Sequence, residues 1–174
     1  MGQVYELAVL QRAIATDPDR WRPLVFTNGC FDLLHVGHVR YLTAAKQLGK
    51  TLVIGLNGDR SVAGLKPQPD HLPDRPIIPE AQRAELLTAL AVVDAVMLFD
   101  EPTATQTIAA LQPDIYVKGG DYTPETLPEA PTVKAYGGKI ELIQIEIPTS
   151  TSGIIQKILK QESIFPTVSC DSLV

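Results

Sequence analysis

Residues 24–49 have the pattern of a buried strand that passes directly into a helix. The strand begins with the apolar run Leu24-Val25-Phe26 and breaks at Asn28-Gly29, a pair typical of turns. The helix that follows carries apolar residues at helical spacing and is expected to end at Gly49. A strand that leads into a helix in this way predicts a β-α unit of a parallel sheet, which restricts the chain to α/β architectures.

The same alternation recurs along the chain. A continuous apolar run at residues 51–56 predicts a strand buried on both faces, and further strands are expected at residues 94–99, 115–117 and 140–145, with helical segments between them. The sequence therefore predicts an α/β fold with a single Rossmann-like, doubly wound, parallel five-stranded sheet in the order 3-2-1-4-5. We expect residues 1–22 to form an N-terminal helical extension that packs outside the core, residues 23–160 the domain, and residues 161–174 a polar tail.

Two histidines, His35 and His38, lie three residues apart at the predicted start of the helix. Residues at this spacing share a helix face, so both imidazoles can point the same way. Free backbone N–H groups at a helix start favour an anion, and Gly37 has no Cβ to keep a ligand away from the backbone. The stretch predicts a phosphate held between two imidazoles and a strand-to-helix turn. A zinc site is the alternative, but it needs more ligands and the sequence has one other histidine, His71.

Polar residues follow other predicted strands at the same edge of the sheet, where open α/β folds bind ligands. Asn57 and Asp59 follow the second strand and either line a site or cap a turn. The run Lys118-Gly119-Gly120-Asp121 follows the fourth strand, as a tight turn or as part of a nucleotide pocket. The hydroxyl run Ser150-Thr151-Ser152 precedes the last helix, which it either caps or equips to bind phosphate.

Residues 61–78 form a long segment rich in proline and polar residues. A loop of this length in a compact domain is commonly functional or mobile. It contains Lys66 and Arg75, so it is either a lid that closes over a phosphate or a solvated loop. Arg83 lies on the helix that follows, either at the surface or close to the site.

Composition limits the classes of partner. The chain has 174 residues and a net charge of −5, which disfavours general nucleic-acid binding because that requires a basic face. Local Lys and Arg residues can still hold an anionic small substrate. The two cysteines lie far apart, no apolar run is long enough to span a bilayer, and the opening residues have no signal-peptide pattern. We therefore expect a cytoplasmic protein without disulfides.

The region from about Leu24 to Lys160 resembles the cytidylyltransferase-like branch of the nucleotidylyltransferase superfamily, and within it the adenylyltransferase domains of ADP-heptose synthases. The resemblance rests on Phe26 through His38, with its His-x-Gly-His pattern. It also rests on further stretches, namely Asn57-Gly58-Asp59, Lys66, Arg75-Pro76-Ile77, Arg83, Val117 to Tyr122 and Ser150-Thr151-Ser152. It implies an adenylyltransferase that joins the AMP moiety of ATP to heptose 1-phosphate, releases pyrophosphate and gives ADP-heptose.

The resemblance also implies residue roles. His35, His38 and Lys66 are expected to be catalytic, with the imidazoles donating hydrogen bonds to the triphosphate and Lys66 stabilising charge as the bond breaks. The nucleotide is expected to contact Thr27, Asn28, Gly29, Cys30, Phe31, His35, Gly37, His38, Lys118, Gly119, Gly120, Asp121, Ser150, Thr151 and Ser152. The acceptor is expected to contact Asp32, Asn57, Asp59, Lys66, Arg75 and Arg83.

We expect Mg²⁺ to be held mainly by the triphosphate of ATP, without a resident metal site on the protein. The expected partners are small-molecule substrates and a separate sugar kinase, because 174 residues cannot hold a fused kinase. A homo-oligomer, most simply a dimer, is expected, with no nucleic-acid or membrane partner. Two alternatives stay open: a cytidylyltransferase acting on glycerol 3-phosphate or a phospho-alcohol amine, and a nucleotide-binding sensor that has lost catalysis.

Overall fold

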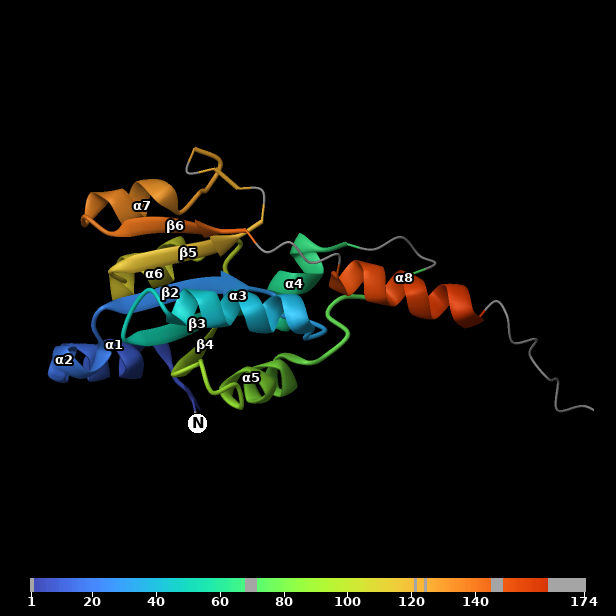
Figure 1. Cartoon of the computed structure of the whole chain (residues 1–174), viewed down its shortest axis with the longest axis horizontal. Coiled ribbons are helices and arrows are strands. Elements are labelled where there is room, and N and C mark those ends of the chain that lie inside the picture. The colour runs from blue at the N-terminus through green and yellow to red at the C-terminus, as the bar shows by residue number, and fades with distance from the viewer. Residues whose placement is uncertain (1, 68–71, 121, 124, 145–148, 163–174) are drawn as a thin grey trace, which may run out of the picture.

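The computed structural model describes residues 2–67, 72–120, 122–123, 125–144 and 149–162, so most of the expected tail lies outside it. Six parallel strands form one sheet in the order β1-β4-β3-β2-β5-β6 (Figure 1). The strands are β1 Gln3–Val4, β2 Leu24–Gly29, β3 Thr51–Asn57, β4 Ala95–Phe99, β5 Ile115–Gly119 and β6 Lys139–Ile143. The helices are α1 Leu7–Thr16, α2 Pro18–Trp21, α3 Val36–Lys46, α4 Asp59–Leu65, α5 Glu80–Thr88, α6 Thr105–Leu111, α7 Ala130–Ala135 and α8 Thr151–Glu162.

Helices cover both faces of the sheet, which explains the continuous apolar runs of its central strands. Along β2, Leu24 and Phe26 belong to a core shared with α1, α6 and α7, whereas Val25 belongs to a second core shared with α3 and α5. Successive side chains of a strand point to opposite faces. A strand buried on both faces therefore has no polar face to alternate with its apolar one.

The five predicted strands are present in the predicted order, as β4-β3-β2-β5-β6. The expected count of five is wrong, because β1 adds an edge strand that pairs in parallel with β4 through Gln3 and Val4. A strand of two residues has no periodicity that a sequence pattern could indicate. The N-terminal segment thus adds more to the fold than an outlying helix, since Leu10 and Ile14 of α1 are buried in the core.

Two element boundaries differ from the sequence expectation, and both affect the site. β2 continues through Asn28 and Gly29, which pair with Gly55 and Leu56 of β3, so the chain turns only after Gly29. Pairing with a neighbouring strand overrides the turn preference of Asn-Gly. In addition, residues 59–65 form α4, so the long loop that was expected from residue 61 begins at Lys66.

The carboxyl ends of β2, β3 and β5 meet at one edge of the sheet, where α3 begins. Figure 1 shows α8 beyond this edge, not on either face of the sheet. The strand ends and helix starts that carry the predicted site residues are therefore gathered on one side of the molecule. In the described part of the chain, no helix is both long and apolar enough to cross a membrane.

Candidate active site

A cavity of about 800 Å³ opens at the carboxyl edge of the sheet, at the topological switch between β2 and β5. Most of the predicted site residues line it, namely Asn28, Gly29, Cys30, Phe31, Asp32, His35, Gly37, His38, Asn57, Lys66, Arg75, Lys118, Gly119, Gly120 and Thr151. The structure does not place all of them there, since the lining leaves out Thr27, Asp59, Arg83, Ser150 and Ser152. Asp121 and His71 lie outside the described residues.

His35 and His38 lie side by side at the start of α3, with ring centroids 3.9 Å apart and 25° between the ring planes. His35 is the N-cap residue, and its Nδ1 accepts a hydrogen bond from the Gly37 N–H at 3.1 Å. A Cβ at position 37 would stand 2.9 Å from the His35 ring, so this capping contact requires glycine. Because Nδ1 is an acceptor, the neutral His35 ring carries its proton on Nε2, the nitrogen that would donate to a phosphate oxygen.

His38 lies deeper than its place in the first helical turn suggests. Its ring packs against Phe31 with centroids 5.3 Å apart, and its buried Nδ1 has no hydrogen-bond partner among the described residues. Phe31 has a left-handed φ of 44° at the point where the chain leaves β2 for α3. A bulky residue in this region of φ/ψ space is strained, and such strain is commonly found at functional sites.

Burial lowers the pKa of both imidazoles. The pKa of His38 falls to about 4 through loss of hydration, with a smaller contribution from His35. Burial also lowers the pKa of His35. Loss of hydration penalises the charged form, so both rings are neutral near pH 7. Neutral rings can donate hydrogen bonds to a triphosphate, but they add no positive charge to the site.

We expect His38 to titrate with a midpoint near pH 4 in the folded protein. Since an exposed histidine has a pKa of about 6.5, protonation favours the unfolded chain, and stability is lost as the pH falls from about 6.5 towards the folded-state value. NMR of the ring protons over the acid to neutral range measures the midpoint, and His38→Ala assigns the signal. A midpoint in the ordinary histidine range would contradict the burial of this ring.

Two lysines bring positive charge to the cavity. Lys66 lines the wall directly after α4. Lys118, near the end of β5, donates from Nζ to the backbone oxygen of Asn28 at 3.3 Å, and burial lowers its pKa. The Oδ1 atom of Asn28 accepts a hydrogen bond from the Tyr116 hydroxyl at 2.8 Å. These contacts join the ends of β2 and β5 and hold Lys118 at the switch point of the sheet.

Thr27 lies behind the cavity wall and positions another residue. It is fully buried, and its hydroxyl pairs with the Tyr41 hydroxyl at 2.7 Å. The Tyr41 hydroxyl also donates to the backbone oxygen of Val117 at 3.1 Å. Tyr41 lines the cavity although no sequence pattern indicated it, because it occupies an apolar position of the α3 repeat. Thr27 thus positions Tyr41 from behind the wall, and its expected direct contact with the nucleotide stays a prediction.

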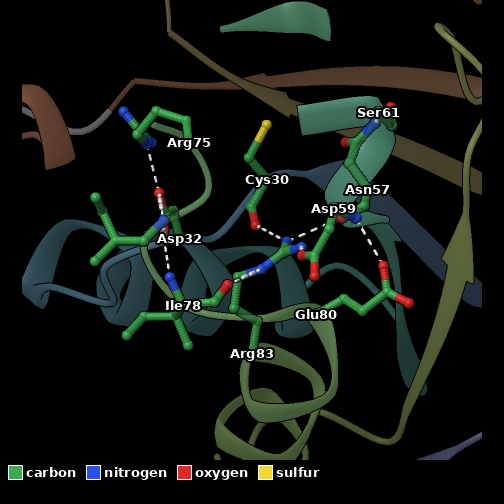
Figure 2. A network of polar contacts seen from close by, with 10 residues as sticks. Cys30, Asp32, Asn57, Asp59, Ser61, Arg75, Ile78, Glu80 and Arg83 are labelled. Atoms are coloured by element: carbon green, nitrogen blue, oxygen red, sulfur yellow. Dashed lines mark hydrogen bonds and ion pairs between the residues drawn. The ribbon is translucent and has the colours of Figure 1, made fainter. Parts of the chain in front are cut away.

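Asp32 and Arg75 form a buried ion pair, with 2.5 Å between Oδ2 and Nε (Figure 2). The Asp32 carboxylate also accepts hydrogen bonds from the backbone N–H groups of Ile77 and Ile78. Its oxygens therefore anchor residues 75–78 beside the cavity, and the expected contact of Asp32 with sugar hydroxyls stays a prediction. Arg75 also lines the cavity. Its side chain is buried and held in place by the ion pair with Asp32, which is not expected for a side chain of a solvated loop.

Arg83 is fully buried and binds the protein itself. Its guanidinium donates to the backbone oxygens of Ile78, Cys30 and Asn57 and pairs with Asp59 at 2.7 Å (Figure 2). These contacts give Arg83 and Asp59 a structural role, and their expected contacts with the acceptor stay predictions. The guanidinium ties together the loop before α5, the turn after β2 and the end of β3, and these segments form the cavity wall.

In the hydroxyl run Ser150 caps α8, whereas the expected phosphate contacts of the run stay predictions. Ser150 Oγ accepts a hydrogen bond from the Gly153 N–H at 3.1 Å, which satisfies a free donor in the first turn of α8. Thr149 and Thr151 line the cavity, whereas Ser152 is exposed. The cavity therefore receives hydroxyl groups from the start of α8 as well as imidazoles from the start of α3.

Part of the wall was not predicted from the sequence. It comes largely from loops on the α6 and α7 side of the sheet, with Pro102, Thr103, Tyr122, Leu127, Pro128 and Glu129. Loop residues have no periodicity, and the proline-rich composition of residues 122–131 was the only signal of this segment.

Across the described ranges, no group of three or more His, Cys, Asp or Glu side chains is arranged to hold a metal ion.

A parallel sheet whose cavity opens at its switch point, with paired imidazoles at a helix start, defines a ligand-binding α/β domain of the Rossmann-like class. A profile of the family described as Cytidylyltransferase-like matches residues 26–163 of the chain. The chain belongs to this family, whose members are nucleotidyltransferase enzymes.

Two curated bacterial proteins have about half of their aligned residues in common with this chain. Bifunctional protein HldE of Syntrophotalea carbinolica is 50% identical over 150 residues, which cover 86% of this chain and 30% of that protein. Bifunctional protein HldE of Citrifermentans bemidjiense is 52% identical over 158 residues, which cover 91% and 31%. The chain thus spans about a third of the length of these relatives.

A solved structure has a similar fold. The lipopolysaccharide core biosynthesis protein from Thermoplasma volcanium aligns with a TM-score of 0.56 and 30% identity, over 72% of this chain and 97% of that one. The parallel sheet and its helices therefore recur in a protein of known structure.

Proposed function

We propose that this chain is an adenylyltransferase that joins the AMP moiety of ATP to a heptose 1-phosphate and gives ADP-heptose and pyrophosphate. The observation that carries the proposal is the stacked, neutral pair of His35 and His38 at a helix start, in one cavity with Lys66 and Lys118. The adenine and heptose specificity is supported by the resemblance to ADP-heptose synthases and by the identity to the bifunctional HldE proteins.

The proposed reaction is an in-line displacement at the α-phosphorus of ATP. An oxygen of the acceptor phosphate bonds to the α-phosphorus, the bond from that phosphorus to the oxygen bridging to the β-phosphate breaks, and pyrophosphate leaves. A phosphate oxygen is already a nucleophile, so no covalent enzyme intermediate is needed. Catalysis then consists of alignment and of stabilising charge on the phosphoryl oxygens. ATP enters as its Mg²⁺ complex, with the metal bound mainly by phosphate oxygens and water.

The position of each residue in the cavity indicates which part of the reaction it assists. His35 donates from Nε2 and His38 from its ring N–H to oxygens of the triphosphate. Thr149, Thr151 and the free N–H groups at the start of α8 hold further phosphate oxygens. Lys66 stabilises the charge that develops on the leaving pyrophosphate. A sugar kinase is the expected supplier of the acceptor, and a homodimer remains the expected assembly.

The test is to incubate the purified chain with Mg²⁺, heptose 1-phosphate and either ATP or CTP, and to follow pyrophosphate release and the product by mass spectrometry. We expect ADP-heptose as the dominant product. A preference for CTP with glycerol 3-phosphate would assign the cytidylyltransferase alternative. No pyrophosphate with any pair of substrates would favour the sensor. A His35→Ala sample prepared in parallel controls for contaminating activity.

A further inference from the structure

The cavity wall contains a carboxylate that the mechanism above does not use. Glu129, in the loop between β5 and α7, lines the cavity and is 3% exposed. Its Oε1 accepts a hydrogen bond from the Ala104 N–H at 3.2 Å, which ties this loop to the start of α6. Its Oε2 is buried and has no hydrogen-bond partner among the described residues.

A structural role accounts for only one of these two oxygens. Holding α6 needs the Oε1 contact, which a glutamine would provide equally well. A buried carboxylate oxygen without a donor destabilises the fold, because it has lost water and gained nothing in exchange. The Tyr116 hydroxyl lies near Glu129, because burial and then the charge and contact of Glu129 raise the pKa of Tyr116, but its one hydrogen is donated to Asn28, and Lys118 also donates to Asn28. The unpaired Oε2 atom of Glu129 therefore indicates a ligand that supplies the missing hydrogen-bond donor.

The position of Glu129 indicates which part of a ligand it meets. Leu127 and Ala130, which flank it, pack in the core shared with α6, whereas α3 packs on the other face of the sheet. In an in-line displacement the attacking and leaving oxygens lie on opposite sides of the phosphorus. If the imidazoles of α3 and the start of α8 hold the leaving pyrophosphate, the acceptor enters from the side of Glu129.

The groups on the Glu129 side of the cavity disfavour the phosphate end of the acceptor and suit its sugar end. A carboxylate repels a phosphate group but accepts hydrogen bonds from hydroxyl groups. Leu127, Pro128 and Pro102, which line the same wall, can pack against the carbon atoms of a sugar ring. The wall therefore suits the neutral, hydroxyl-bearing part of the acceptor.

We propose that Glu129 Oε2 accepts a hydrogen bond from a sugar hydroxyl of the acceptor and so directs the acceptor phosphate towards the imidazoles. The inference rests on the proposed function, because it concerns the acceptor of that reaction. It makes Glu129 a specificity-determining residue that favours a polyhydroxylated phosphate over a bare phosphate.

The test compares KM for heptose 1-phosphate and for ATP in the wild type, Glu129→Gln and Glu129→Ala. Glu129→Gln keeps the Oε1 acceptor for Ala104, so its fold should persist, and a thermal melt verifies this. The control is Glu125→Gln, an exposed glutamate of the same loop. We expect KM for heptose 1-phosphate to rise about tenfold in Glu129→Gln and further in Glu129→Ala, the scale for one hydrogen bond to a charged group. KM for ATP and both constants of the control should stay unchanged.

An unchanged acceptor KM in folded Glu129→Gln would overturn the inference. An equal rise in KM for ATP would also overturn it, because the carboxylate would then belong to the nucleotide site. Failure of the proposed function looks different, since the wild type itself would form no ADP-heptose. In that case, calorimetry compares the binding of heptose 1-phosphate with that of inorganic phosphate, in the wild type and in Glu129→Gln. Loss of the preference for the sugar phosphate in Glu129→Gln would support the inference, and an unaltered preference would overturn it.

Discussion

Replacing either His35 or His38 by alanine is expected to lower kcat about a hundredfold or more, the scale for removing one preorganised donor to a charge-bearing oxygen. Both rings are neutral near pH 7, so each acts through a single N–H group, which alanine removes. Steady-state pyrophosphate release with ATP and heptose 1-phosphate measures the effect. Arg40→Ala, which changes an exposed residue of the same helix, is the control and should keep near-normal kcat.

The two histidines differ in what else their removal takes away. His35→Ala removes the cap of α3, which costs about 1 kcal/mol of stability, and His38→Ala removes a packing partner of Phe31. His35→Asn separates the effects, because asparagine is a good cap but cannot reproduce the Nε2 donor. We expect His35→Asn to melt close to the wild type and still lose turnover. Near-normal kcat in any of these folded variants would contradict the phosphate-binding role of the pair.

The sheet was predictable because its determinants are local in sequence. Residues 52–56 carry no polar side chain, as is typical of a strand buried on both faces, and the carboxyl end of such a strand is where a ligand site is expected. The position of the imidazole pair followed in the same way from the three-residue spacing of His35 and His38 at a helix start. These features need no knowledge of contacts between distant segments.

Side-chain roles were less predictable because they depend on distant partners. The sequence left Arg83 either at the surface or close to the site, because its guanidinium is directed by the carbonyl groups of Cys30 and Asn57, which lie 53 and 26 residues away in sequence. Asp32 is likewise committed to backbone N–H groups 45 and 46 residues away, at Ile77 and Ile78. Glu129 escaped notice because a loop residue has no periodicity that would single it out. Spacing therefore located the cavity, and the tertiary contacts decided which side chains face it.

Replacing Arg83 by alanine is expected to lower the free energy of unfolding by about 3–5 kcal/mol, because a large buried side chain and the donor for three backbone oxygens are lost together. The side chain is fully buried, and alanine leaves the backbone oxygens of Ile78, Cys30 and Asn57 without their donor. Each buried acceptor left unpaired costs about 1–3 kcal/mol before relaxation. Asp59 contributes less, because its side chain is 41% exposed and water can replace the lost partner.

Urea unfolding of the wild type and three variants tests this account of Arg83. Arg60→Ala is the matched control, because the Arg60–Asp100 ion pair is exposed and solvent-screened, so its loss should hardly change the free energy of unfolding. Arg83→Lys should recover only part of the loss seen in Arg83→Ala, since one ammonium group cannot reach the separate acceptors that a planar guanidinium spans. If Arg83→Ala were as stable as Arg60→Ala, the guanidinium would not hold the cavity wall together, and that result would favour the predicted contact of Arg83 with the acceptor.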